Sequence, residues 1–189
     1  MPGDDERRSV PVATLANKKT WRIIGVIVAV ALIITGLVLV LDRANDGAVE
    51  DPAALTMTVR LGDEEIEVLP YRICNMFEEG EGACTTDDDA TAHVAIGPEE
   101  VAEIEVADEV ASVTWAVQRF YVDEAVNSAD RKEPGEAKTE SVAGSASVNG
   151  ERVPLGVIEV STTVIGHDDA GEEVPYGITW SVANDVDGE

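Results

Sequence analysis

Apolar and polar side chains alternate along much of the chain after residue 55, with the two-residue period that is typical of β-strands. In the first run Met57, Val59 and Leu61 alternate with polar residues, and a second run ends at Val68. Gly62-Asp63 lies between them and favours a hairpin turn, because glycine readily adopts a positive φ. The same period recurs at residues 92–96, 104–106, 113–117, 157–165 and 176–182.

Two further turns are indicated by local sequence. The polar loop from Gly166 to Gly171 separates the last two alternating runs, and Asn149-Gly150 is a candidate for a type I′ turn. With about seven to nine short strands expected, the economical fold is mainly β, an immunoglobulin-like β-sandwich over residues 55–183. Trp115 and Trp180 have apolar neighbours two residues away, so we expect both in the core.

Some segments lack this alternation. Residues 98–110 begin with Pro98 followed by acidic residues, which favours a single helical turn. The polar stretch 123–147 is rich in Ala, Glu, Ser and Gly, and we interpret it as a long connection. Residues 42–54 are interpreted as a stalk, and residues 184–189 as an acidic tail.

A continuous apolar segment precedes the β pattern. From Ile23 to Leu41, nineteen residues carry no charge and no Asn, Gln or Pro. As a helix this segment spans about 28 Å, close to the hydrocarbon thickness of a bilayer. It therefore predicts one transmembrane α-helix ahead of the β domain. The weaker alternatives are a cleaved signal peptide, whose apolar region is about 7 to 15 residues long, and a buried soluble helix.

The flanking cations predict the orientation of this helix. Lys18, Lys19 and Arg22 precede it, whereas Arg43 is the only basic residue between the helix and Arg60. Because basic residues are retained preferentially on the cytoplasmic side, we expect residues 1–22 in the cytoplasm. Residues 42–189 are then extracytoplasmic, and membrane lipid contacts the protein through its anchor helix.

The extracytoplasmic part is strongly acidic. Residues 42–189 hold eight basic and 35 acidic side chains, and hence a net charge of −27. Such a charge repels nucleic acid, so no nucleic-acid partner is expected, and it favours solubility and cationic partners.

Both cysteines, Cys74 and Cys84, lie in this extracytoplasmic part. Their spacing matches neither the Cys-x-x-Cys redox motif nor a zinc-ligand pair. Disulfides persist outside the cytoplasm, so we predict that the two residues form one.

The chain offers little catalytic chemistry. Its two histidines, His93 and His167, stand in no recognisable motif, and we expect both to be ordinary surface residues. Acidic pairs are too abundant to discriminate a hydrolase without a cleft. We therefore predict no catalytic residues, no metal and no cofactor. Calcium is the weak exception, with candidate ligands at Asp87, Asp88, Asp89, Asp168 and Asp169, although none has EF-hand spacing.

Several blocks together resemble a known family. They are Tyr71-Arg72-Ile73-Cys74-Asn75 with Cys84, Trp115 with Phe120-Tyr121, and the closing Pro175-Tyr176 and Trp180-Ser181-Val182. The chain resembles, over roughly residues 20–182, the actinobacterial family of membrane-anchored proteins known only as a domain of unknown function. Residues 123–150 have no counterpart in the resemblance. It implies an envelope protein with a β-rich exterior domain and no assigned activity.

Location, fold and the missing catalytic set favour a non-enzymatic binding or scaffolding component of the cell envelope, beside an envelope or membrane protein complex. The alternative is an exterior module that binds calcium or a small ligand. A divergent envelope hydrolase is the third hypothesis.

Overall fold

The computed structural model describes residues 47–80, 82–168 and 170–185. The predicted transmembrane helix, Ile23 to Leu41, and the cytoplasmic segment 1–22 lie outside these residues. Within the described ranges no helix has the length and apolar character needed to cross a bilayer.

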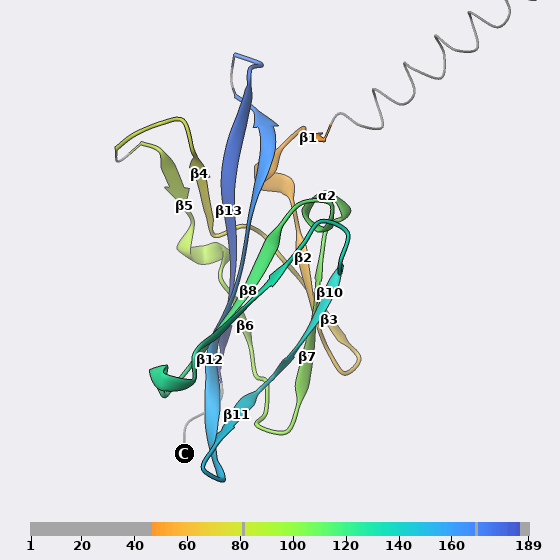
Figure 1. The fold of residues 1–189 in the computed structure, drawn as a ribbon, viewed down its shortest axis with the longest axis vertical. Coiled ribbons are helices and arrows are strands. Elements are labelled where there is room, and N and C mark those ends of the chain that lie inside the picture. Colours follow the sequence, from red (N-terminus) through yellow and green to blue (C-terminus); the bar gives the residue numbers. More distant parts are fainter. Residues whose placement is uncertain (1–46, 81, 169, 186–189) are drawn as a thin grey trace, which may run out of the picture. The chain divides into compact units, whose positions relative to one another are not determined.

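Strands dominate the described chain and form two sheets (Figure 1). The larger sheet has the order β5-β4-β13-β12-β8-β9, with β1 and β11 paired to β12 and β6 paired to β13. The smaller sheet has the order β10-β7-β2-β3. The strands are β1 (Ala48–Val49), β2 (Met57–Leu61), β3 (Glu64–Val68), β4 (Arg72–Asn75), β5 (Cys84–Thr86), β6 (Ala92–Val94), β7 (Val101–Val106), β8 (Trp115–Tyr121), β9 (Ser128–Lys132), β10 (Thr139–Ala143), β11 (Ser145–Val148), β12 (Glu151–His167) and β13 (Glu173–Asn184). The short helices are η1 (Pro52–Ala54), η2 (Asp88–Ala90), α2 (Asp108–Ala111) and η3 (Glu124–Val126).

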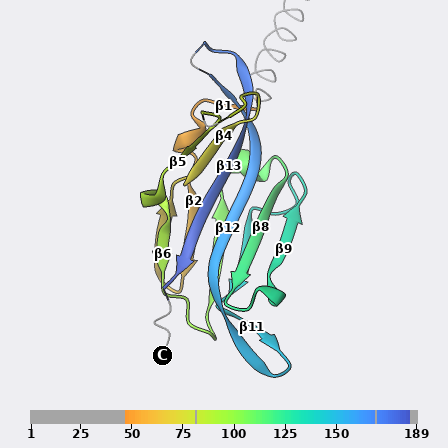
Figure 2. The same cartoon turned by 90° about the vertical axis from the view of Figure 1, so that its left-hand side faces the viewer.

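β12 and β13 form a long hairpin at the centre of the larger sheet. Figure 2 shows both strands running along the length of that sheet. They pair antiparallel from Val157↔Ala183 to His167↔Glu173. Val160 and Val164 are buried on β12, whereas Ser161 is half-buried and Thr163 is exposed. The alternation in the sequence therefore places apolar residues toward the core and small hydroxyl residues on the outward face.

The core takes side chains from both sheets. Val59, Ile104 and Val142 come from the smaller sheet, and they belong to one buried cluster with Trp115 and Trp180 of the larger sheet. The indole Nε1 of Trp180 donates to the Leu55 carbonyl at 3.1 Å, so its polar atom is satisfied. The predicted inward positions of both tryptophans are confirmed. Each indole buries enough area to contribute about 4 to 6 kcal/mol.

The predicted turns are also confirmed. Gly62, between β2 and β3, has a φ of 60°. Asn149 and Gly150, between β11 and β12, have φ values of 53° and 89°, as a type I′ turn requires at both central positions.

The prediction of a long connection over residues 123–147 is wrong, because this segment contributes β9, β10 and most of β11. β9 lies at the edge of the larger sheet and β10 at the edge of the smaller one. An edge strand carries polar side chains on its solvent side, so the apolar alternation that reveals an inner strand is weak.

The helical turn expected within 98–110 is only partly correct. Residues 101–106 form β7, which pairs with β2 on one side and β10 on the other. The single helical turn, α2, comes later at Asp108–Ala111. Tertiary pairing on both sides overrides the local preference of an acidic segment.

The folded domain extends into the segments predicted as the stalk (42–54) and the acidic tail (184–189). β1 pairs in parallel with β12, and Pro52 of η1 is buried, so residues 47–54 belong to the folded domain. At the other end the Asn184 side chain bonds the backbone of Ile96 and Leu155. A two-residue strand has no period to detect, which explains why β1 escapes sequence analysis.

A cluster of salt bridges joins the edges of the two sheets. Arg119 points inward from β8, is 8% exposed, and binds Asp130 of β9 and Glu140 of β10. Lys132 also binds Glu140, with its Nζ 2.7 Å from Oε2. The buried guanidinium is thus neutralised by carboxylates from both sheets.

Candidate functional site

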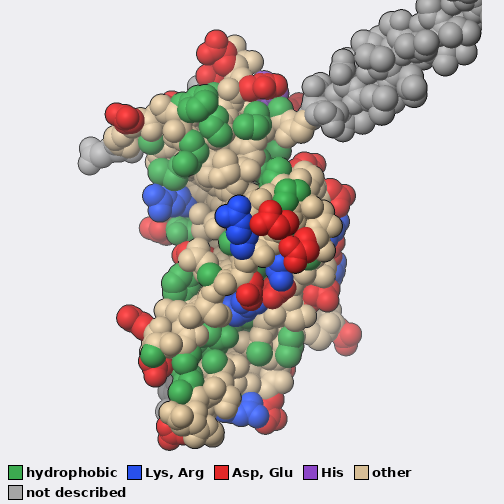
Figure 3. Space-filling model, in the orientation of Figure 1, with side chains coloured by type: hydrophobic (Ala, Val, Ile, Leu, Met, Phe, Trp, Pro, Cys, Tyr) green, Lys and Arg blue, Asp and Glu red, His purple; other side chains and the backbone are tan. Residues whose placement is uncertain are grey.

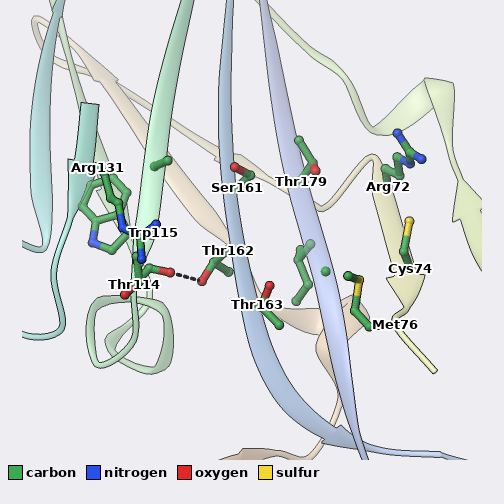
Figure 4. A pocket seen from close by; sticks show the side chains of 13 residues that line it. Arg72, Cys74, Met76, Thr114, Trp115, Arg131, Ser161, Thr162, Thr163 and Thr179 are labelled. Carbon is green, nitrogen blue, oxygen red and sulfur yellow. Dashed lines mark hydrogen bonds between the residues drawn. The ribbon is translucent and has the colours of Figure 1, made fainter. Parts of the chain in front are cut away.

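A shallow trough crosses the outward face of the larger sheet, with a volume of about 620 Å³ (Figure 4). Five adjacent strands contribute to it: β4, β13, β12, β8 and β9. Its lining residues are Arg72, Cys74, Met76, Thr114, Trp115, Ala116, Arg131, Ser161, Thr162, Thr163, Gly177, Ile178 and Thr179.

The trough follows from the sizes of the side chains along one cross-strand row. The order across the sheet is Arg72, Thr179, Ser161, Ala116 and Arg131, each opposite its neighbour in the strand register. The three central residues are small and the two terminal ones are long, so the row is low in the middle and raised at both ends. Four strand spacings separate its ends, or about 19 Å between their backbones.

The charge of the lining is opposite to that of the domain. Two of the thirteen lining residues are arginines and none is Asp or Glu. Figure 3 shows acidic side chains spread over the visible face, with basic ones beside them. A lining free of carboxylates is therefore unusual in this domain.

Arg72 differs from the other basic residues of the described chain. It has no described carboxylate within 4 Å, whereas each of the other six Lys and Arg residues has at least one. Its Nη2 lies 3.7 Å from Cys84 Sγ, and its side chain is exposed at one side of the trough. Arg131, at the other side, has the exposed Glu133, at 3.4 Å, as its one carboxylate partner among the described residues.

Hydroxyl groups line the centre of the trough. Ser161, Thr163 and Thr179 project outward between the two arginines, as Figure 4 shows. Thr162 points the other way and donates to the Thr114 carbonyl at 2.8 Å. The floor thus offers donors and acceptors that are not used by the sheet's own backbone pairing.

The nearest acidic group on the same face of β12 is Glu159, outside the lining. It accepts a hydrogen bond of 3.4 Å from the Tyr71 hydroxyl. Burial, together with the charge of Glu159, raises the pKa of the Tyr71 phenol. Glu159 is therefore held by a neutral donor beside the trough.

The predicted disulfide forms one edge of the trough. Cys74 of β4 and Cys84 of β5 are joined with an S–S distance of 2.07 Å. They occupy directly paired positions on adjacent strands, so the bond closes the β4–β5 hairpin. Met76, directly after the last residue of β4, is 58% exposed, so this end of the trough is partly apolar.

The candidate calcium ligands are engaged in turns. Asp87 accepts from the Asp89 N–H at 3.1 Å and caps η2, in which Asp88 is the first residue. Asp168 accepts from the backbone N–H groups of Ala170 and Glu172, both at 2.9 Å. Asp169 lies outside the described residues. Among the residues described, no three His, Cys, Asp or Glu side chains gather as a metal site would need.

Both histidines are exposed and lie outside the trough lining. His93 Nδ1 is 3.0 Å from Asp185, and His167 ends β12. The lining itself contains no histidine, lysine or carboxylate to serve as a general base. The polar groups that the lining offers are two guanidinium groups and the hydroxyls of Ser161 and the threonines.

Of the trough residues, the sequence pointed to Cys74 as a disulfide partner and to Trp115 as core, and Arg72 entered only within the block that carries the family resemblance; none was predicted as a site residue. The available signal was a strand whose outward positions are small, Ser161 and Thr163, next to Gly177 on its partner. That signal has meaning only when the partner strands are known.

No curated protein and no solved structure matched the chain. A family model described as a protein of unknown function, DUF2771, matches residues 50–185, which covers every strand from β2 to β13. The chain therefore belongs to the DUF2771 family.

Proposed function

We propose that this protein is a membrane-anchored, extracytoplasmic binding component of an actinobacterial cell envelope, without enzymatic activity. In this proposal the domain is an immunoglobulin-like β-sandwich that binds its partner or ligand on the outward face of the larger sheet. The observation that carries the proposal is the trough whose lining has two arginines and no carboxylate in a strongly acidic domain.

Location rests on the sequence and on the disulfide. The apolar segment 23–41 and its preceding cations support an anchor with the domain outside. The bond between Cys74 and Cys84 supports an oxidising compartment. Two sheets with one shared core support a sandwich.

The residues of the lining support a binding role rather than a catalytic one. Nucleophilic hydroxyls are present, but catalysis by them needs an adjacent base. Within the lining no such group lies beside Ser161 or the threonines. The hydroxyls are therefore assigned to hydrogen bonding with a bound molecule.

The binding surface is tested by photo-crosslinking in cells that express the full chain. A photoreactive residue is placed at Ser161, on the trough floor, or at Ser141, an exposed position on β10 of the smaller sheet. We expect a discrete adduct from position 161 and none from position 141. Equal adducts from both positions, or none from 161, would refute the proposed surface.

The topology is tested by labelling introduced cysteines with a membrane-impermeant maleimide. Ser141→Cys should react in intact cells, and Ser9→Cys should react only after permeabilisation. Labelling of Ser9→Cys in intact cells would overturn the proposed orientation.

A further inference from the structure

We propose that the trough binds a short, hydroxyl-rich ligand that carries an anionic group, a carboxylate or a phosphate, paired with Arg72. This inference rests on the proposed binding function and names the chemistry of its ligand.

Arg72 supplies the charge for this interaction. In a domain with a large excess of acidic side chains, the other six basic residues of the described chain are each paired with a described carboxylate. Arg72, at one end of the trough, instead has its Nη2 3.7 Å from Cys84 Sγ of the disulfide, and Figure 4 shows its guanidinium beyond the central hydroxyl groups. Guanidinium groups bind carboxylate and phosphate oxygens with two parallel hydrogen bonds, so an anionic ligand group is the natural partner.

The centre of the trough selects for hydroxyl groups. Thr179 and Ser161 are opposite each other in the register, and Thr163 follows on the same face. Such side chains both donate to and accept from a polyol. Among the thirteen described lining residues the aromatic ring is that of Trp115, which is only 1% exposed and so cannot stack on a neutral sugar; the exposed Phe77 is not in the lining. Binding must then come from charge and hydrogen bonds.

Arg131 offers a second, weaker anchor at the opposite end. Its partner Glu133 is 67% exposed and 3.4 Å away, and exposed pairs of this kind contribute little free energy. A second anionic group on the ligand can replace Glu133 at low cost.

The surroundings limit the ligand's length. The trough volume of about 620 Å³ lies in the range of small-molecule sites. Beyond the trough the domain is acidic, and charges interact over a Debye length of about 10 Å at 0.1 M salt. A long polyanion would be repelled outside the trough, whereas a short ligand stays within it.

Calorimetry of the full-length chain in an uncharged, sugar-free detergent tests this inference with three probes. Trigalacturonate supplies carboxylates, glycerol 3-phosphate supplies a phosphate, and maltotriose is the neutral control. We expect saturable heat with at least one anionic probe, none with maltotriose, and weaker binding as salt rises. The probe that binds distinguishes a carboxylate ligand from a phosphate ligand.

Matched variants locate the interaction. Arg72→Gln should lower the affinity for the anionic probe about tenfold or more, because a charge-assisted pair is lost. Arg152→Gln removes the same charge from an exposed residue outside the trough and should change nothing. Ser161→Glu puts a carboxylate on the floor and should abolish binding, which provides a second test if Arg72→Gln is unstable.

No saturable heat with either anionic probe would overturn the inference, as would equal binding of maltotriose or equal effects of Arg72→Gln and Arg152→Gln. Crosslinking from position 161 distinguishes failure of the anionic-ligand inference from failure of the proposed binding function. An adduct that persists in Arg72→Gln cells keeps the binding surface and refutes the anionic ligand. Absence of the adduct in the otherwise unaltered chain refutes both.

Discussion

Replacing Arg119 by Met should destabilise the domain by about 2 to 3 kcal/mol. Arg119 is 8% exposed and donates to Asp130 and to Glu140, two carboxylates on different sheets. Hydrogen bonds to charged groups each contribute about 1.5 to 3 kcal/mol. Methionine retains the apolar part of the side chain, so the loss is mainly electrostatic.

Two features keep the expected loss below the sum of both bonds. The Asp130 side chain is 54% exposed, so water can solvate its carboxylate once the guanidinium is gone. Glu140 is only 17% exposed, but it keeps Lys132 as a partner. The remaining cost is largely that of a poorly neutralised Glu140 between the sheets.

The assay is guanidinium unfolding of the full chain under non-reducing conditions, monitored by tryptophan fluorescence. The matched control is Arg152→Met, whose pair with Glu99 is exposed on both sides and should be worth about 0 to 1 kcal/mol. A double variant with Glu140→Gln should lose less than the sum of the single losses, since the two residues interact directly. A loss from Arg119→Met no larger than that from Arg152→Met would refute the reasoning.

Three further predictions concern the disulfide, a close backbone contact and an acidic cluster. Replacing Cys74 and Cys84 together by Ala should lower the free energy of unfolding by about 3 kcal/mol, the chain-entropy value for a loop of this length, measured by the same assay. Gly144→Ala should cost about 1 to 3 kcal/mol by thermal unfolding, because a Cβ there would lie 2.1 Å from the Gly97 carbonyl oxygen. Arg60 first, and then Lys138, hold the pKa of Glu105 below its ordinary value through hydrogen bonds. The Glu105 carboxylate therefore contributes to the free energy of unfolding above about pH 4.3, and this contribution is lost as the pH falls through the lowered pKa.

Each of these has an internal comparison. For the disulfide, adding reductant to the unaltered chain should reproduce the loss, and an unchanged midpoint would contradict the prediction. Gly82→Ala has open space and no positive φ, so it should be neutral; equal losses at Gly82 and Gly144 would exclude the contact as the cause. Glu105→Gln should lose less stability between pH 7 and pH 3 than Glu103→Gln, and the reverse order would refute the assignment.

The sequence alone determined the features that depend on residues near one another in the chain. Alternation at Met57–Leu61 and along Val157–Ile165 predicted strands, and at Met57–Leu61 it also predicted the correct inward face, because the side-chain period of two is local. Gly62 and Asn149-Gly150 predicted their turns, because positive φ is a property of those residues. The disulfide was predictable from cysteine number and compartment, and Trp115 and Trp180 were predictable as core from their neighbours.

Only the tertiary structure decided the edge strands and the trough. Residues 123–147 carry polar side chains because their strands lie at or near sheet edges, and nothing local distinguishes such strands from loops. The trough row joins Arg72, Ser161 and Arg131 from strands that are far apart in sequence. Such a surface on a sheet is set by which strands are neighbours and by their register, and a shift of one residue in any of these strands would send that strand's side chain to the other face.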